Sequence, residues 1–388
     1  MRRRYGAPAA ALGLVVAAAL ASCSDGGVAT DASSGTTSTP ASTSPSTSTG
    51  TPTPTPTPSP TPAGGAPSGG TAARPAVLRA TPAPLAWRPV DGPVSTSVTR
   101  SGPWSLSVTK SGHYTLDGPH ASTGPQGSGT RVSDALIDGD WAVVVLQDKA
   151  EQRPSTAEVT ELATGRSFRL DGSSDVPTTN GGTWALDGGR LLHATLGPGH
   201  AYCVATVDLA SRRSTLGWCA PKRHGFTGAH LSPAGDSLLT FDDAQPSCRT
   251  VVRLEGTRVT PFEGVEDCKG WDGLLTDDGA VWSVIPKENQ IESAHFYARA
   301  GDGWFDLGPG TAGSLVECGG AAYFVRDPQR DGGPAALMRW TAADGLTVAY
   351  ESPAGQAFLS EPRCGGDALT LTALAEAGDE QVTAPLGR

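Results

Sequence analysis

Seven glycine-containing turns recur between residues 102 and 366 and divide this part of the chain into units of similar length. Each turn is followed by a short run rich in aliphatic, β-branched or aromatic residues, such as 141–145 (Trp-Ala-Val-Val-Val) and 281–285 (Val-Trp-Ser-Val-Ile). Successive turn glycines lie 37 to 50 residues apart. A repeat of this period indicates an array of similar modules. The turn glycines are Gly102, Gly139, Gly189, Gly235, Gly279, Gly320 and Gly366.

The runs within one unit are typical of β-strands. In one unit, residues 157–162 and 166–170 are two such runs, joined by a tight turn that contains Gly165. No window holds an apolar period of 3.6 residues over a dozen residues, so helices are not expected. Repeated four-stranded units of about 40–45 residues are typical of β-propeller blades. We therefore predict an all-β fold, a β-propeller with seven blades, and keep six blades as the alternative.

The predicted ring also needs a closing strand. The last unit ends with residues 381–386 and has room for only three strands. The segment Pro84–Trp87 precedes the first unit, and we predict that it supplies the fourth strand of the last one. Closure of this kind leaves no open sheet edge on which another chain can add.

One segment carries a family resemblance. Residues 230–240, His-Leu-Ser-Pro-Ala-Gly-Asp-Ser-Leu-Leu-Thr, resemble the strand–turn–strand signature F-S-P-D-G-x-x-L of TolB-like and WD-repeat propellers. The match covers these eleven residues in one unit and departs at Ala234, where the family usually has Asp. The resemblance implies propeller architecture. It carries no ligand with it, because the partners of these families differ widely.

The N-terminal residues read as an export signal. Three arginines at positions 2–4 precede an apolar run over residues 7–21. This run is shorter than the ~20 helical residues that span a bilayer and has the length of a signal-peptide core. Leu20-Ala-Ser-Cys23 then resembles the lipobox of bacterial lipoproteins, of an actinobacterial-like kind. The resemblance implies a signal peptide over residues 1–22 and lipidation of Cys23. The alternative is a plain cleavable signal followed by a chance cysteine.

The next segment has the composition of a tether. Every residue from 32 to 70 is Ala, Gly, Pro, Ser or Thr, and such a segment buries too little apolar surface to offset the entropy of ordering. We predict a disordered tether over residues 23–82 and the propeller over residues 83–388. The lipid at Cys23 would then hold the protein on the extracytoplasmic face of the cell membrane, with the membrane as its partner.

The charge of the chain argues against one class of partner. The net charge is −10, and loss of residues 1–22, which hold three arginines and no acid, makes it −13. Nucleic-acid binding needs basic patches that displace counterions from phosphates. We therefore expect no nucleic-acid partner.

Six cysteines follow Cys23, and an even number in an exported domain favours disulfides. Cys203 lies at the start of a third strand and Cys219 at the end of the fourth strand of the same unit. Cys248 and Cys268 hold the same places in the next unit. Cys318 and Cys364 each precede a Gly-Gly turn, in adjacent units. A zinc site is the rival, but the close C-x-x-C spacing is absent. We predict the disulfides Cys203–Cys219, Cys248–Cys268 and Cys318–Cys364.

No catalytic motif stands out in the sequence. None of the seven histidines lies in an H-x-H or H-E-x-x-H pattern, and neither a G-x-S-x-G elbow nor a Walker loop occurs. Three adjacent acid pairs, at 242–243, 266–267 and 277–278, are read as solvated turn residues. We therefore predict no catalytic residue, no cofactor and no metal site, and we expect that the chain is not an enzyme.

The main functional hypothesis is a surface-anchored binding or scaffold module whose blade loops bind a protein, a peptide or a cell-wall glycan. It predicts a shallow polar funnel without a cluster of carboxylates. One alternative is an extracellular glycan-active hydrolase or lyase, which a pocket with two carboxylates about 5–9 Å apart would favour. Another is an accessory or sensing subunit of a membrane complex. The sequence does not define the oligomeric state.

Overall fold

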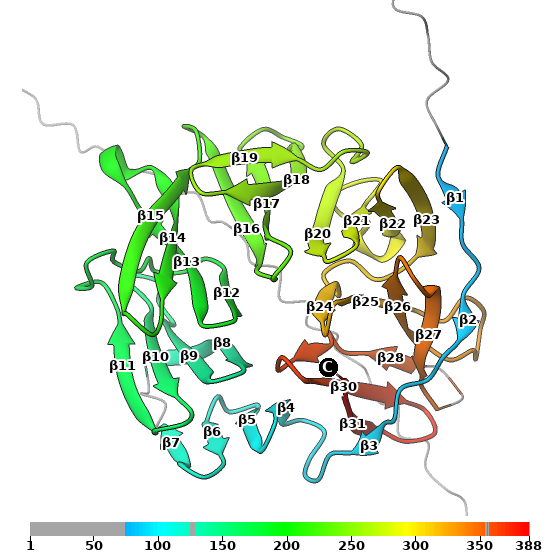
Figure 1. Cartoon of the computed structure of the whole chain (residues 1–388), viewed down its shortest axis with the longest axis horizontal. Helices are drawn as coiled ribbons and strands as arrows, with labels where there is room; N and C mark the ends of the chain where they lie inside the picture. The colour runs from blue at the N-terminus through cyan, green and yellow to red at the C-terminus, as the bar shows by residue number, and fades with distance from the viewer. Residues whose placement is uncertain (1–73, 125–128, 354, 356, 388) are drawn as a thin grey trace, which may run out of the picture. The chain divides into compact units, whose positions relative to one another are not determined.

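The structure is a computed structural model that describes residues 74–124, 129–353, 355 and 357–387. These residues form seven sheets around a central channel, a seven-bladed β-propeller (Figure 1). Helix within them is confined to two single 3₁₀ turns, η1 (Pro198–His200) and η2 (Ile291–Ser293). The predicted all-β propeller and its seven blades are confirmed. The signal peptide, Cys23 and most of the predicted tether lie outside the described residues.

The blades follow one another along the chain, and the first strand of each lies nearest the channel. Blade 1 holds β4 (Ser97–Ser101), β5 (Trp104–Val108), β6 (Tyr114–Asp117) and β7 (Ser122–Gly124). Blade 2 holds β8 (Thr130–Asp138), β9 (Trp141–Asp148), β10 (Thr156–Glu161) and β11 (Arg166–Leu170). Blade 3 holds β12 (Trp184–Asp187), β13 (Arg190–Leu196), β14 (Tyr202–Asp208) and β15 (Arg213–Cys219).

The second half of the ring repeats this order. Blade 4 holds β16 (His224–His230), β17 (Asp236–Asp242), β18 (Arg249–Glu255) and β19 (Arg258–Pro261). Blade 5 holds β20 (Gly270–Thr276), β21 (Gly279–Val284), β22 (His295–Ala300) and β23 (Gly303–Pro309). Blade 6 holds β24 (Val316–Cys318), β25 (Ala321–Arg326), β26 (Ala336–Thr341) and β27 (Gly345–Glu351). In blade 7, β28 (Ala357–Leu359) and β29 (Arg363–Cys364) both pair with β30 (Ala368–Ala375), which pairs with β31 (Glu380–Pro385).

The seven glycine turns all occupy one place in the blade, between its first and second strands. Gly139 (φ 54°) and Gly320 (φ 81°) show why glycine is used there, because the left-handed backbone of a tight hairpin turn penalises a Cβ. The repeat in the sequence is therefore the repeat of this hairpin.

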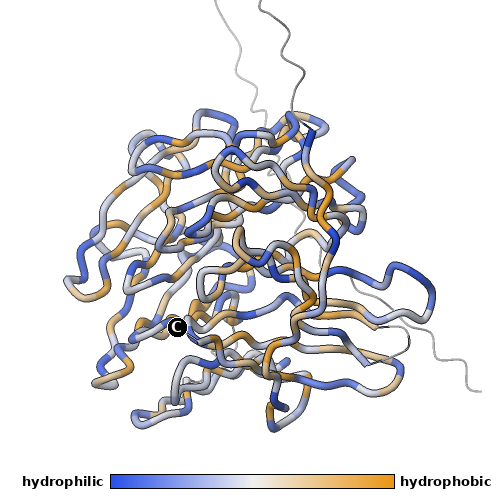
Figure 2. The backbone as a smooth tube through the Cα atoms, turned by 45° about the vertical axis from the view of Figure 1, so that its right-hand side comes forward, coloured by the Kyte–Doolittle hydropathy of each residue, from blue (hydrophilic) through white to orange (hydrophobic). Residues whose placement is uncertain are grey.

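The core lies between the blades. On β9, Val143 and Val145 pack toward blade 3 while Ala142 and Val144 pack toward blade 1, so both faces of the strand are buried. This explains why the second strands are almost continuously apolar rather than alternating. Figure 2 shows hydrophobic segments mainly within the strands of the blades. Six such apolar clusters fill the junctions from blade 1 to blade 7.

The seventh junction, between blades 7 and 1, is held mainly by polar contacts within the described part of the chain. The Gly102 N–H donates to Asp367 Oδ1 (2.9 Å), and Gln381 Nε2 donates to the Thr96 carbonyl (3.0 Å). The ring is therefore weakest in apolar packing where its two ends meet.

The N-terminal segment closes the ring from outside. Strand β3 (Arg88–Pro89) pairs antiparallel with β31 and is the fourth strand of blade 7. This lies just after the predicted Pro84–Trp87, whose Leu85 N–H and Trp87 Nε1 instead donate to the Ala349 carbonyl of blade 6.

The same segment reaches further back around the rim than the sequence indicated. Strands β1 (Ala76–Val77) and β2 (Thr81–Pro82) pair in parallel with β23 and β27, at the outer edges of blades 5 and 6 (Figure 1). The tether was predicted to extend to residue 82, yet residues 76–82 belong to the propeller. Two-residue strands leave no alternating apolar pattern from which the earlier start could be predicted.

The six cysteines lie in the three predicted pairs, Cys203–Cys219, Cys248–Cys268 and Cys318–Cys364. The first joins β14 to β15 within blade 3, where the two residues are cross-strand partners. The second differs from the prediction in detail, because Cys268 lies in the connection after β19 rather than at its end. The third joins blades 6 and 7, with the two Cα atoms 5.6 Å apart.

Candidate functional site

The central channel is a cavity with a volume of about 790 Å³. It is lined by the first strands of the blades and by several of their glycine turns, so the ring itself sets the position of each lining side chain. Two cations, Lys110 and Arg363, line it together with His230. Five acids also line it: Asp134, Asp138, Asp187, Glu317 and Glu361.

Three carboxylates occupy the same level of the ring. Asp134, Asp272 and Glu361 each lie four residues before the residue that closes the first hairpin of their blade, which is Asp138, Thr276 or Gly365. Because the hairpins of the blades are equivalent, these residues of blades 2, 5 and 7 come to similar depths in the ring, although only Asp134 and Glu361 line the channel. The sequence analysis did not single out any of the three.

Each of these carboxylates lies at an irregularity of the innermost strand. The register of β8 shifts between Val132 and Asp134, and that of β20 shifts around Asp272. In blade 7 the innermost strand is interrupted between β28 and β29, and Glu361 lies in the gap. A bulge redirects a side chain and is frequent next to active sites. The irregular backbone therefore directs polar groups into the channel where a regular strand would pack them between blades.

Asp272 has a structural role. Its Oδ2 accepts hydrogen bonds from Ser283 Oγ of the same blade (3.1 Å) and from the Gly313 N–H in the connection to blade 6 (2.7 Å), and both bonds hold the carboxylate in place. Burial nonetheless raises the pKa of Asp272 to about 6.

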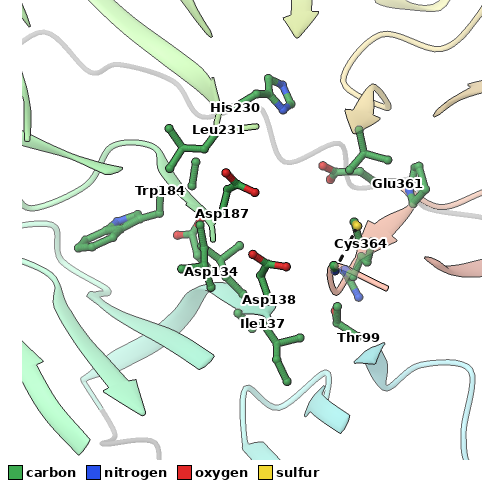
Figure 3. A pocket seen from close by; sticks show the side chains of 18 of the residues that line it. Thr99, Asp134, Ile137, Asp138, Trp184, Asp187, His230, Leu231, Glu361 and Cys364 are labelled. Atoms are coloured by element: carbon green, nitrogen blue, oxygen red, sulfur yellow. Dashed lines mark hydrogen bonds between the residues drawn. The ribbon is translucent and has the colours of Figure 1, made fainter. Parts of the chain in front are cut away.

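Asp134 and Glu361 are the carboxylates left available for chemistry. The Glu361 carboxylate forms no hydrogen bond or ion pair with any other described residue, and only the neighbouring Ser133 hydroxyl bonds to Asp134. Desolvation within the ring raises the pKa of Asp134 to about 6 and also raises that of Glu361, although the Glu361 side chain remains accessible to solvent. The negative charge of Asp134 also contributes to the raised pKa of Glu361. In Figure 3, Glu361 lies across the channel from Asp134.

His230 enters the same channel from blade 4. It follows a register shift of β16 between Thr227 and His230. Burial lowers the pKa of His230 to about 4, so the imidazole is neutral at ordinary pH. A neutral imidazole in a cavity can accept or donate a proton, and perturbed groups of this kind gather at functional sites.

One mouth of the channel, at the glycine turns, is acidic. Asp138, Asp187, Asp277 and Glu317 come from four blades, and burial together with the charges of the other three raises the pKa of Glu317 to about 7. Two of these carboxylates accept hydrogen bonds from the backbone: the Gly188 N–H donates to Asp138 (2.7 Å) and the Gly320 N–H donates to Glu317 (2.7 Å). The mouth thus links blades and gives the channel a negative potential.

The channel differs from the expected shallow funnel, because carboxylates gather in it. The acid pairs noted in the sequence have other places: Asp243 pairs with Arg223, and Asp278 accepts a hydrogen bond from the Ala342 N–H. Among the described residues, no group of three or more His, Cys, Asp or Glu side chains is arranged to hold a metal ion. None of their helices is long and apolar enough to cross a membrane.

The fold and the channel define a closed seven-bladed propeller with an acidic channel on its axis. No family model matches the sequence, and no curated protein matches it significantly. The β-propeller domain of the Trilobed protease from Pyrococcus furiosus is similar over 74% of this chain and 94% of that chain, with a TM-score of 0.52 and 10% identity. That propeller has an open velcro topology, whereas β3 closes the ring here.

Two other solved structures are similar at low identity. A prolyl endopeptidase matches over 75% of this chain and 48% of its own, with a TM-score of 0.50 and 13% identity, so this chain spans about half of its length. Oligogalacturonate lyase from Vibrio parahaemolyticus matches over 80% of this chain and 99% of its own, with a TM-score of 0.46 and 12% identity. The likenesses to the Trilobed protease propeller and to the prolyl endopeptidase support the propeller fold.

The prediction that the chain is not an enzyme is wrong. It relied on the absence of a linear motif, but the two similar propellers reported above with a TM-score of at least 0.50 come from peptidases. In a propeller, the residues of a site come from different blades and share no local pattern, as Asp134 and Glu361 do here.

Proposed function

We propose that the protein is an extracellular glycan-active hydrolase whose site is the central channel. The observation that supports this most is the pair Asp134 and Glu361, two carboxylates that line the same channel and make no ion pair with any other described residue. Most glycoside hydrolases use two carboxyl groups on either side of the scissile bond, one as general acid and one as base or nucleophile. Both roles depend on pKa values that the site sets apart.

The surroundings assign the two roles. Burial raises the pKa of Asp134 to about 6, and no cation opposes that rise. At Glu361, the Arg363 guanidinium lowers the pKa and so opposes the effect of burial. We therefore assign the general acid to Asp134, whose charged form no cation favours, and assign to Glu361, whose charged form Arg363 favours, the role of the carboxylate that activates water or attacks the sugar.

The test is a hydrolysis assay with the full-length protein on a panel of cell-wall and soluble polysaccharides. New reducing ends should appear with at least one polymer and be absent with the double variant Asp134→Asn/Glu361→Gln. A product that carries a new carbon–carbon double bond would show elimination by a lyase instead. If no polymer is cleaved, or if the double variant cleaves as fast as the wild type, the proposal fails.

We also propose that the protein works on the outer side of the membrane, held by a lipid on Cys23. The order of arginines, apolar run and lipobox over residues 1–23 supports this. In cells fed a labelled fatty acid, the wild-type protein should be labelled and remain with the membrane fraction. Cys23→Ser should abolish the label and leave the protein either unprocessed or in the medium, whereas a label retained by Cys23→Ser would contradict the anchor.

A further inference from the structure

The innermost strand of blade 1 presents a row of hydroxyl groups to the channel. Ser95, Ser97 and Thr99 are alternate residues just before and on β4, and all three line the channel. Alternate residues of a strand share one face of its sheet. On that face Leu106, the cross-strand partner of Thr99, packs against blade 2. The hydroxyls are therefore turned toward the blade that carries Asp134.

Ser97 lies at the level of the two candidate catalytic carboxylates. It is four residues before Ser101, which closes the first hairpin of blade 1 by pairing with Trp104, and Asp134 and Glu361 have the same offset in their blades. Blade 1 lies between blades 7 and 2 in the ring (Figure 1). A ligand that contacts both carboxylates by the shorter way around the channel therefore lies beside β4.

Thr99 differs from most buried hydroxyl residues of this molecule. It is only 5% exposed, and its hydroxyl forms no hydrogen bond with any other described residue. Among the described residues, every other buried serine or threonine except Ser101 and Ser155 forms a side-chain hydrogen bond. Neither Ser101 nor Ser155 lines the channel, whereas Thr99 lies at its wall (Figure 3).

The missing hydrogen bond of Thr99 points to a ligand. A buried hydroxyl without a partner is unfavourable, and the Thr99 oxygen is not one of the polar atoms that the protein seals off completely. A group that enters the channel can therefore supply the bond. A hydroxyl both donates and accepts, so it suits the hydroxyl and amide groups of a sugar.

We propose that Ser97 and Thr99 form a hydrogen-bonding subsite beside Asp134, and that the sugar bound there is uncharged. This inference rests on the proposed function, because it uses the same channel and names the class of glycan that enters it. The two residues act by positioning the sugar against the carboxylates and by selecting it.

The charge of the channel supports a neutral sugar. The lining holds five acids against two cations, so it opposes a glycan whose sugars carry carboxylates. An ammonium group gains most from a carboxylate as its direct partner, and the side chains of this wall are uncharged hydroxyls. A neutral sugar satisfies the hydroxyls without either mismatch.

The test measures binding without turnover. Full-length Glu361→Gln protein is titrated by calorimetry with neutral hexasaccharides of glucose, mannose or N-acetylglucosamine, and with charged hexasaccharides of galacturonic acid or glucosamine. We expect at least one neutral compound to bind, and to bind more tightly than both charged ones. Adding Thr99→Val, which replaces the hydroxyl by a methyl group of similar size, should weaken that binding about tenfold, as loss of one hydrogen bond to a ligand gives. Ser97→Ala should weaken it in the same direction.

Two controls separate recognition from a change in structure. Thr99→Ser keeps the hydroxyl and should bind as the parent protein does. Thr123→Val, on the exposed outermost strand β7 of the same blade, is the matched control and should also leave binding unchanged. Binding that is as tight in Thr99→Val as in the parent, or tighter binding of a charged hexasaccharide, would overturn the subsite, as would failure of all the neutral compounds to bind.

The kinetics of the wild-type protein separate this inference from the proposed function. Hydrolysis of a neutral polymer whose KM is the same in wild type and Thr99→Val would reject the subsite and retain the hydrolase. Binding that depends on Thr99, without hydrolysis by the wild type, would retain the subsite and reject the hydrolase.

Discussion

Glu361→Gln and Asp134→Asn are each expected to lower the rate of glycan hydrolysis by about 10²–10⁴-fold, the contribution typical of a positioned acid or base. The two amides match their parent acids in shape, and Glu361 makes no hydrogen bond or ion pair within the described residues that an amide would break. Both variants should therefore fold as the wild type does. The measurement is the initial rate of reducing-end release, with circular dichroism and thermal melting as checks on the fold.

The pH profile distinguishes the two roles. The general acid must carry its proton, and the folded protein raises the pKa of Asp134 to about 6, so the wild-type rate should fall as the pH rises through that value. In Asp134→Asn this alkaline decline should disappear, because the group that titrates is gone. A decline that stays in Asp134→Asn would assign the acid elsewhere.

A matched control separates chemistry from general charge effects. Asp302→Asn removes one carboxylate at the exposed tip of the β22–β23 hairpin, away from the channel. Its rate should equal that of the wild type. If Asp302→Asn lost as much activity as the channel variants, the loss would reflect overall charge rather than the site.

Removing the Cys318–Cys364 disulfide should have the largest effect on stability. The bond closes 46 residues of sequence, for which the chain-entropy model gives about 4 kcal/mol. The double variant Cys318→Ala/Cys364→Ala should therefore unfold at a lower temperature, by roughly 10 °C. The loss should concentrate in blade 7, because this bond joins blade 7 to blade 6 while the junction of blade 7 with blade 1 has mainly polar contacts.

Hydrogen exchange can localise this effect. In Cys318→Ala/Cys364→Ala, amides of β30 and β31 should lose protection, while those of β17 and β18 in blade 4 keep theirs. Removal of the Cys203–Cys219 disulfide is the comparison, since that bond lies within blade 3 and joins no second blade. If both double variants lost protection evenly around the ring, the propeller would open as one unit and blade 7 would have no special weakness.

The architecture could be predicted because its determinants are local. A tight hairpin that needs a left-handed backbone favours glycine, as at Gly139 and Gly320, whatever the surrounding sequence is. Seven turn glycines therefore indicate seven blades. The cysteine pairs followed from the same register, since Cys203 and Cys219 face each other across one hairpin. The pairing of β1 and β2 at the N-terminal end of the propeller was not predicted, because it relies on backbone hydrogen bonds that any short sequence can make.

The site could not be predicted, because it depends on backbone irregularities and on residues from distant blades. Asp134 and Glu361 are 227 positions apart, and each looks like an ordinary solvated acid in its own segment. The bulge before Asp134 and the gap in blade 7 that holds Glu361 change where these side chains point, but neither leaves a periodic signal. A comparison of equivalent positions in all seven first strands is the analysis that would have aligned Asp134, Asp272 and Glu361.

The path of residues 74–90 around the rim has a mechanical consequence. A pull applied from the N-terminal side reaches β1 on blade 5 first and then β2 on blade 6, before any load arrives at β3. The short outer pairs can part and rejoin while the strand that completes blade 7 stays in place. The pairings of β1 and β2 would therefore break before tension on the chain reaches β3, the strand that completes blade 7.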